Sequence, residues 1–154
     1  MTAEDIRKLF KIAHTAGIRK LKITGGEPLI RGDIVKLTRM GADTFDEVSM
    51  TTNGVLLASY ARDLKRAGLD RTNVSLDTLD PKLYESITRS DKIDDVIQGI
   101  DKALQVGLEP LKINTVLLKG VNVSHLPQLL VFASSRKSQR REDWFDSRRR
   151  TSCS

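Results

Sequence analysis

Apolar residues recur along this chain in two alternating patterns, one with helical spacing and one with strand spacing. Helical spacing comes first, three or four residues apart, at Ile6, Leu9, Phe10 and Ala13. It predicts a helix that begins at an N-cap on Thr2 and ends at Gly17, since glycine readily takes the left-handed position after a helix. A strand is expected directly afterwards, over about residues 18–24.

The same order of helix, glycine and strand returns further along the chain. Two more helical patterns end at Gly68 and Gly107, and a shorter one covers about residues 34–40. The strands that follow are marked by apolar pairs, at Val48 and Met50, Val74 and Leu76, and Leu111 and Ile113. Helices that alternate with short strands predict an α/β protein with a parallel sheet and crossover helices.

Each predicted strand has one apolar face and one polar face. Side chains alternate along a strand, and the polar faces carry, among others, Lys22, Thr51, Ser75 and Lys112. Strands of a doubly wound sheet are apolar on both sides, because helices cover both. Helices on one side only would leave a wet, polar lumen, so we expect a partial barrel rather than a doubly wound sheet. About four βα units cannot close an eight-stranded barrel, which takes about 250 residues.

Polar motifs follow the strands directly. After the first strand, Gly25 and Gly26 would let a ligand approach the backbone, and Glu27 adds a carboxylate. Taken singly, TGGEP, TTNG and SLD are also typical of ordinary turns and helix caps. The inward lysines, Lys22 and Lys112, would be costly to bury unless water or an anion meets them. Because parallel strand ends converge on one mouth, an anionic ligand site is one of the two interpretations that stay open.

Composition narrows the class of protein. The chain has 154 residues, with 26 Lys+Arg and 20 Asp+Glu, and no apolar run approaches the roughly 18 residues of a membrane helix. Residues 136–150 hold seven basic and three acidic side chains, which leaves 19 and 17 elsewhere. The body is therefore nearly neutral, and nucleic acid is not an expected partner. The one cysteine, Cys153, excludes an internal disulfide framework and indicates a reducing compartment.

Four segments together resemble the molybdenum cofactor biosynthesis protein A family, the GTP 3′,8-cyclases of the radical S-adenosylmethionine (SAM) superfamily. In chain order, over about residues 2–122, they are GIRKLKITGGEPLIRGDI, SMTTNG, LKRAGLDRTNVSLDTLDP and LKINTVLLKGVN. GGEP alone indicates only the superfamily, whereas the ordered set is much more specific.

The resemblance implies a partial (βα)6 barrel that converts GTP in the first step of molybdenum cofactor synthesis. A reduced 4Fe-4S cluster cleaves SAM in this family, and the radical that results takes hydrogen from the GTP ribose. The implied SAM contacts are Gly25, Gly26, Glu27 and Ser75. The implied GTP contacts are Lys22, Thr51 and Lys112, with Lys22 standing where the family usually has arginine. The resemblance also implies a homodimer in the cytoplasm, or in mitochondria if the source is eukaryotic.

The sequence departs from the family in its cysteines and in its last residues. The family binds one cluster through a CxxxCxxC loop and a second through three C-terminal cysteines, but this sequence has only Cys153. We therefore expect a piece of the enzyme that lacks both cluster-binding regions, with no catalytic or metal-ligating residue of its own and no activity alone.

From residue 123 onwards the sequence diverges into a basic tail that we expect to be disordered, although Leu126 to Ala133 has the composition of a helix. A frameshift or artificial end, or a basic arm for an anionic surface, would explain this tail. Alternative functions are another radical SAM enzyme, a cluster-free nucleotide-binding module, or a truncated product without function.

Overall fold

The computed structural model describes residues 1–136, and this part of the chain is a parallel β-sheet with helices on one side. The strands are β1 (Lys20–Ile23), β2 (Glu47–Thr52), β3 (Arg71–Ser75) and β4 (Leu111–Asn114). The α-helices are α1 (Ala3–Thr15), α2 (Ile34–Ala42), α3 (Leu57–Arg66), α4 (Pro81–Thr88), α5 (Ile93–Gln105) and α6 (Leu126–Ser135). Two short 3-10 helices, η1 (Pro28–Ile30) and η2 (Val123–His125), lie in the connections.

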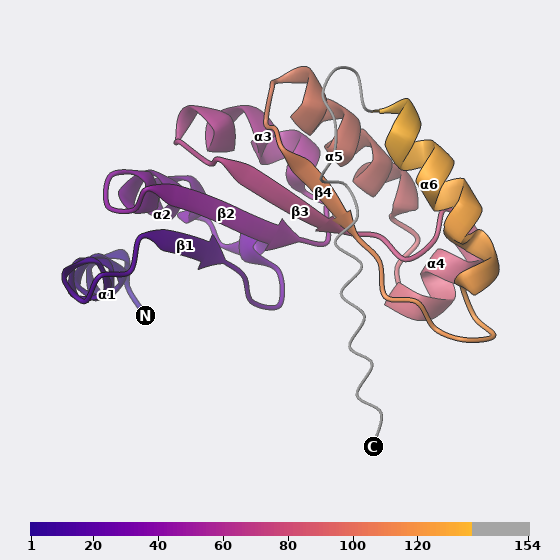
Figure 1. The fold of residues 1–154 in the computed structure, drawn as a ribbon, viewed down its shortest axis with the longest axis horizontal. Coiled ribbons are helices and arrows are strands. Elements are labelled where there is room, and N and C mark those ends of the chain that lie inside the picture. Colours follow the sequence, from indigo (N-terminus) through magenta and orange to yellow (C-terminus); the bar gives the residue numbers. More distant parts are fainter. Residues whose placement is uncertain (137–154) are drawn as a thin grey trace.

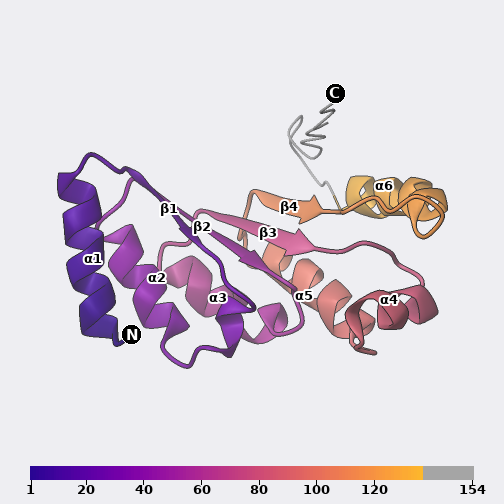
Figure 2. The same ribbon diagram turned by 90° about the horizontal axis from the view of Figure 1, so that it is seen from below.

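The strand order is the order of the sequence, β1-β2-β3-β4, and every neighbouring pair is parallel. Helices α1, α2, α3 and α5 lie side by side along one face of the sheet, and no helix of residues 1–136 lies across the other (Figures 1 and 2). A doubly wound sheet reverses its strand order so that helices cover both faces. Sequential strands with one layer of helices confirm the prediction of an α/β fold with a partial barrel.

The core lies between the sheet and these helices. Val48, Met50 and Val74 point toward the helices and are fully buried, and Leu57 and Val96 meet them from α3 and α5. The exposure pattern along β2 alternates strictly between half-buried and buried residues. The period-two pattern of the sequence therefore places the hydrophobic side of the sheet correctly.

Two helices differ from the expected elements. Helix α4 was not predicted; its signal was the pair Asp80–Pro81, where the Asp80 carboxylate accepts a hydrogen bond from the Leu83 amide and proline takes the first helical turn. Asp77 and Thr78 do not cap this helix: the Asp77 carboxylate accepts a hydrogen bond from the Val116 amide, and the Thr78 hydroxyl bonds the His125 ring.

Helix α6 includes the segment from Leu126 to Ala133, which has the composition of a helix. Leu129 and Phe132 are buried in the common core, and Arg136 bonds Asp101 of α5. The ordered chain thus continues past the expected boundary at residue 122, because these side chains remove apolar surface from water. Residues 137–154, which include most of the basic tail and Cys153, lie outside the described residues. No helix in the described part is both long and apolar enough to cross a membrane.

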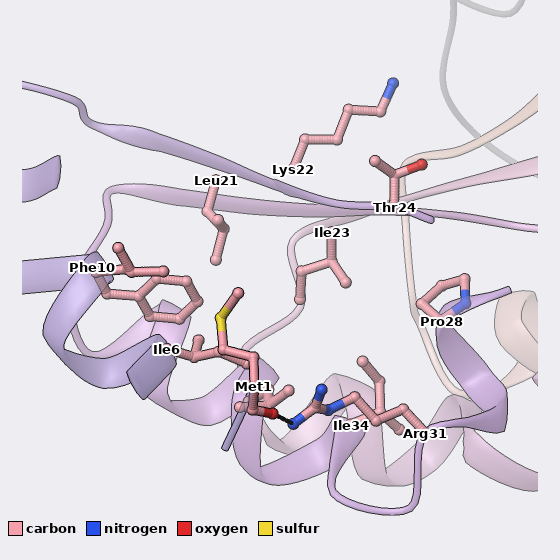
Figure 3. Close-up of a pocket in the computed structure, with 12 residues that line it drawn as sticks. Met1, Ile6, Phe10, Leu21, Lys22, Ile23, Thr24, Pro28, Arg31 and Ile34 are labelled. Carbon is pink, nitrogen blue, oxygen red and sulfur yellow. Dashed lines mark hydrogen bonds between the residues drawn. The ribbon is translucent and has the colours of Figure 1, made fainter. Parts of the chain in front are cut away.

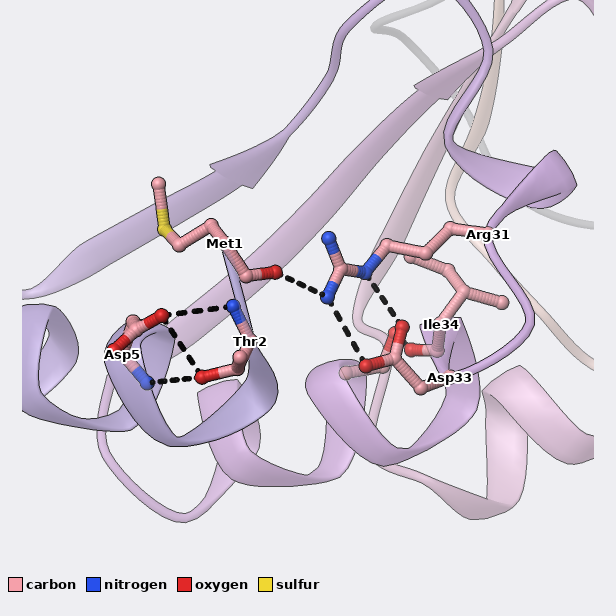
Figure 4. A network of polar contacts seen from close by, with 7 residues as sticks. Met1, Thr2, Asp5, Arg31, Asp33 and Ile34 are labelled. Atoms are coloured by element: carbon pink, nitrogen blue, oxygen red, sulfur yellow. Dashed lines mark hydrogen bonds and ion pairs between the residues drawn. The ribbon is translucent and has the colours of Figure 1, made fainter.

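Helix α1 is attached at the edge of the helical layer rather than within it. A capping box joins Thr2 and Asp5 at its start, Phe10 meets the Phe45 ring edge-on at 5.2 Å, and no α1 residue is fully buried. The Arg31 guanidinium donates hydrogen bonds to the Met1 carbonyl at 3.2 Å and to both Asp33 carboxylate oxygens (Figure 4). Arg31 therefore connects the start of α1 to the segment that follows β1.

We expect Arg31→Ala to speed hydrogen exchange in α1 and to leave exchange in β2 and β3 unchanged. The Arg31 hydrogen bond is the main cause that lowers the pKa of Asp33 below its usual 3.8. The contact is therefore complete above pH 3.8 and is lost as the pH falls through the lowered pKa. Arg7→Ala, which removes an exposed pair with Glu4, is the control. Equal protection of α1 in both variants would show that Arg31 does not hold the helix.

Candidate functional site

The open face of the sheet carries rows of polar side chains that the strand register aligns. One row runs from Lys22 through Ser49 to Arg71, and the next from Thr51 through Asn73 to Lys112. Figure 3 shows Lys22 and Thr24 on the side of β1 opposite to Leu21 and Ile23. The structure therefore contains the expected polar face. The expected GTP contacts Lys22, Thr51 and Lys112 lie on β1, β2 and β4, and Asn73 of β3 stands between the last two.

This face is cationic. Glu47 pairs with Lys20 at 3.4 Å and with Arg71 at 3.7 Å, at the end of the sheet where the strands begin. Lys22 and Lys112 form no ion pair with any residue in the described part of the chain. Lys22 lies in the same row as Arg71. Lys112 lies one row nearer the carboxyl ends of the strands, the side where βα loops build binding sites in barrels. An anion on this face would meet both ammonium groups.

The loop after β1 presents bare backbone at the same end. Gly25 has φ +152°, a conformation that side chains rarely adopt, and no atom lies within 4 Å of where a Cβ on Gly25 or Gly26 would stand. Neither glycine backbone takes part in a hydrogen bond with another described residue outside the sheet ladder. A polar ligand can therefore approach these peptide groups closely.

The Glu27 carboxylate turns from this loop toward the end of β2. It accepts hydrogen bonds from the Thr52 hydroxyl at 2.7 Å, from the Asn53 amide at 2.7 Å and from the Leu29 amide at 3.0 Å. Thr52 was not among the expected site residues, because strand alternation places it on the apolar side. Its partner there is a carboxylate from another loop, and no local sequence signal reveals that contact.

The ends of β3 and β4 are joined by a third set of contacts. Ser75 pairs in register with Asn114, and both are exposed on the open face. Behind them, Asn122 is fully buried and donates to the carbonyls of Asp77 and Val116. The Asp77 carboxylate accepts the Val116 amide at 2.8 Å. The KGVN segment of the sequence therefore holds the loop after β4 against the end of β3, where Ser75 lies.

Two polar atoms in the Thr51 row lack partners. The Thr51 hydroxyl and the Asn73 side-chain oxygen are inaccessible to solvent, and neither makes a hydrogen bond within residues 1–136. Buried polar atoms usually find a partner, and leaving one unpaired costs about 1–3 kcal/mol. In the same row, the Lys112 ammonium and the Thr51 hydroxyl are donors for an anionic group, whereas the Asn73 oxygen needs a donor from the ligand.

An apolar hollow lies elsewhere, between α1, β1 and α2. It has a volume of about 350 Å³ (Figure 3), and most of its lining is apolar, including Ile6, Phe10, Leu21 and Ile23. It lies mainly on the helical side of β1, away from the rows of polar side chains. Such a lining does not suit a triphosphate.

An iron–sulfur cluster does not fit the residues present. Thiolates are the usual cluster ligands, and the only cysteine of the sequence is Cys153. Residues 1–136 contain no group of three or more His, Cys, Asp or Glu side chains placed to hold a metal. Ligands for a cluster would have to come from outside these 154 residues.

Comparison with known proteins agrees with this architecture. The profile of the radical SAM superfamily matches residues 1–133. The structure of Streptococcus suis SuiB bound to S-adenosylmethionine superposes with a TM-score of 0.75 at 25% identity, over 89% of this chain and 32% of that one. Archaeal TYW1 superposes with a TM-score of 0.63 at 15% identity, over 88% of this chain and 49% of that one, which shows a shared fold.

The match covers most of the chain, and the chain belongs to the radical SAM superfamily. Among curated relatives, the probable GTP 3′,8-cyclase of Archaeoglobus fulgidus is 47% identical over 135 residues, which are 88% of this chain and 45% of that protein. The GTP 3′,8-cyclase of Petrotoga mobilis is 49% identical over 125 residues, which are 80% of this chain and 39% of that protein. The chain thus spans less than half the length of these relatives.

Proposed function

We propose that this chain is the SAM- and GTP-binding part of a GTP 3′,8-cyclase, which converts GTP in the first step of molybdenum cofactor synthesis. The observation that carries the proposal is the row formed by Thr51, Asn73 and Lys112 beside Lys22 on the open face. Relatives that are 47–49% identical and bear this name support it. Both expected cationic contacts lie on the face that this geometry leaves open to a triphosphate.

In this proposal, Lys22 and Lys112 attract the phosphates and the Thr51 hydroxyl orients the nucleotide. Ammonium groups bind phosphate oxygens through charge-assisted hydrogen bonds, although Lys22 gives no bidentate contact as arginine would. Gly25, Gly26 and Ser75 hold SAM at the ends of β1 and β3. SAM, when bound, supplies the radical chemistry of the superfamily, and the protein's part is to orient the two molecules. The whole enzyme would act as a homodimer in the cytoplasm.

A chimaeric enzyme tests this function. Residues 1–133 of this chain would replace the matching segment of the Petrotoga mobilis GTP 3′,8-cyclase. The cysteines of that enzyme outside the exchanged segment would stay in place. We expect the anaerobically reconstituted chimaera to convert GTP to the 3′,8-cyclised nucleotide, measured by liquid chromatography and mass spectrometry. The same chimaera with Thr51→Val is the matched control and should lose most of its turnover.

The result that contradicts the proposal is a folded chimaera that cleaves SAM but leaves GTP unchanged. Cleavage of SAM without GTP conversion would point to another radical SAM reaction, on a peptide or a different small molecule. Binding of SAM and GTP by the 154-residue chain, together with an inactive chimaera, would favour a nucleotide-binding module without catalysis.

A further inference from the structure

Glu27 stands between two loops that the proposed function assigns to different ligands. Its backbone continues the Gly25–Gly26 segment, the proposed SAM loop. Its carboxylate reaches residues 52 and 53, which directly follow Thr51, the proposed GTP contact. The carboxylate accepts three hydrogen bonds from other residues of the chain, two of them at 2.7 Å.

The far side of this contact is held firmly in place. Thr52 is 2% exposed, and its hydroxyl, which donates to Glu27, also accepts the Gly54 amide at 3.0 Å. Gly54 has φ +87°, and a Cβ there would come within 2.8 Å of Val74. The end of β2 is therefore packed against β3 and α5, so that Glu27 binds a rigid support rather than a loose turn.

Both oxygens of the carboxylate are used. Oε1 accepts the Leu29 amide and the Thr52 hydroxyl, and Oε2 accepts the Asn53 amide. A glutamine of the same size could keep the first pair of bonds, but its amide nitrogen cannot accept a hydrogen bond from an amide N–H. The second acceptor oxygen is thus needed for the bond to the Asn53 amide.

We infer that Glu27 is a positioning residue that fixes the proposed GTP loop to the proposed SAM loop, rather than a direct contact to either ligand. This inference rests on the proposed function for the identity of the ligands. The Glu27 carboxylate of GGEP then binds the end of β2, and the backbone of Gly25 and Gly26 makes the SAM contacts. GTP binding then depends on a residue that does not touch GTP.

The test compares Glu27→Gln with the wild-type 154-residue chain. Exchange of the Asn53 amide should become faster, and the Kd for GTP, measured by calorimetry, should rise about fivefold or more, a typical size for an effect transmitted between sites. Thr52→Val should also speed Asn53 exchange and raise the Kd for GTP. Thr52→Ser, which keeps the hydroxyl, should leave both at their wild-type values. Glu47→Gln is the matched control, since it changes a carboxylate on the same sheet at the opposite strand ends.

Two outcomes overturn the inference. If Glu27→Gln weakens SAM binding alone, with GTP affinity and Asn53 exchange unchanged, the carboxylate is a ligand contact and the proposed function survives. If the wild-type chain binds no GTP, the proposed function fails and the inference fails with it. Faster Asn53 exchange together with weaker GTP binding in Glu27→Gln, and neither change in Glu47→Gln, supports the inference.

Discussion

Replacing Gly99 by alanine is expected to lower the free energy of unfolding by about 2 kcal/mol, because a methyl group has no room between α5 and the end of β2. A Cβ on Gly99 would stand 2.5 Å from the Gly54 carbonyl oxygen and 3.0 Å from the Leu57 Cβ. Overpacking typically costs about 1–3 kcal/mol and sometimes more. The gain in helix propensity from glycine to alanine, about 1 kcal/mol, does not offset a clash with backbone.

The surroundings of Gly54 explain why the clash cannot relax. Val74 of β3 and Val96 of α5 both crowd Gly54, so its turn has little room to shift away from a methyl group on Gly99. Gly32→Ala is the control, since no atom lies within 4 Å of a Cβ there and its φ is not in the left-handed region. Urea denaturation of both variants measures the effect. A Gly99→Ala protein as stable as Gly32→Ala would contradict the close approach of α5 to this loop.

Replacing Lys112 by alanine is expected to weaken GTP binding by roughly tenfold to a hundredfold. Hydrogen bonds to charged groups contribute about 1.5–3 kcal/mol, and every 1.4 kcal/mol is a factor of ten in affinity. Lys112 has no carboxylate partner within residues 1–136, so its charge is available to a ligand. Calorimetry of the wild-type and variant chains with GTP measures the change, and added salt should weaken wild-type binding more than that of the variant.

Lys36→Ala is the matched control for this prediction. Lys36 is an exposed residue of α2, in the helical layer, and its removal changes the net charge by the same amount. A similar loss of affinity in both variants would mean that GTP responds to overall charge rather than to the row of Thr51, Asn73 and Lys112. An unchanged affinity in Lys112→Ala would remove this lysine from the proposed site.

The sequence was most informative where one local rule determines the structure. Alternation along β2 placed Met50 in the core and Thr51 on the open face, because side-chain direction in a strand depends only on position. At the next residue, alternation did not predict the contact. Thr52 shares the buried side with Met50, yet its hydroxyl donates a hydrogen bond to Glu27, which lies 25 residues earlier in the chain.

Among the helices, too, local signals were reliable and long-range contacts were not visible in the sequence. The α1 capping box consists of Thr2 and Asp5, three residues apart, and the structure contains both of its hydrogen bonds. Helix α4 is short, and its start depends on Asp80 and Pro81 in a segment without a clear apolar stripe. The attachment of α6 rests on Leu129 and Phe132 meeting a core built by distant elements. Local composition indicated a helix over Leu126 to Ala133, but it carried no information on what that helix packs against.

The sequence by itself determined the class of fold, the polar face of each strand and the superfamily, since these follow from periodicity and contiguous motifs. Only the tertiary structure decided which polar residues share a row, because the register of parallel strands depends on crossover packing. It also decided that the Glu27 carboxylate binds the end of β2, and that Asn122 holds the loop after β4. Such contacts join residues far apart in the chain, where spacing carries no information about distance.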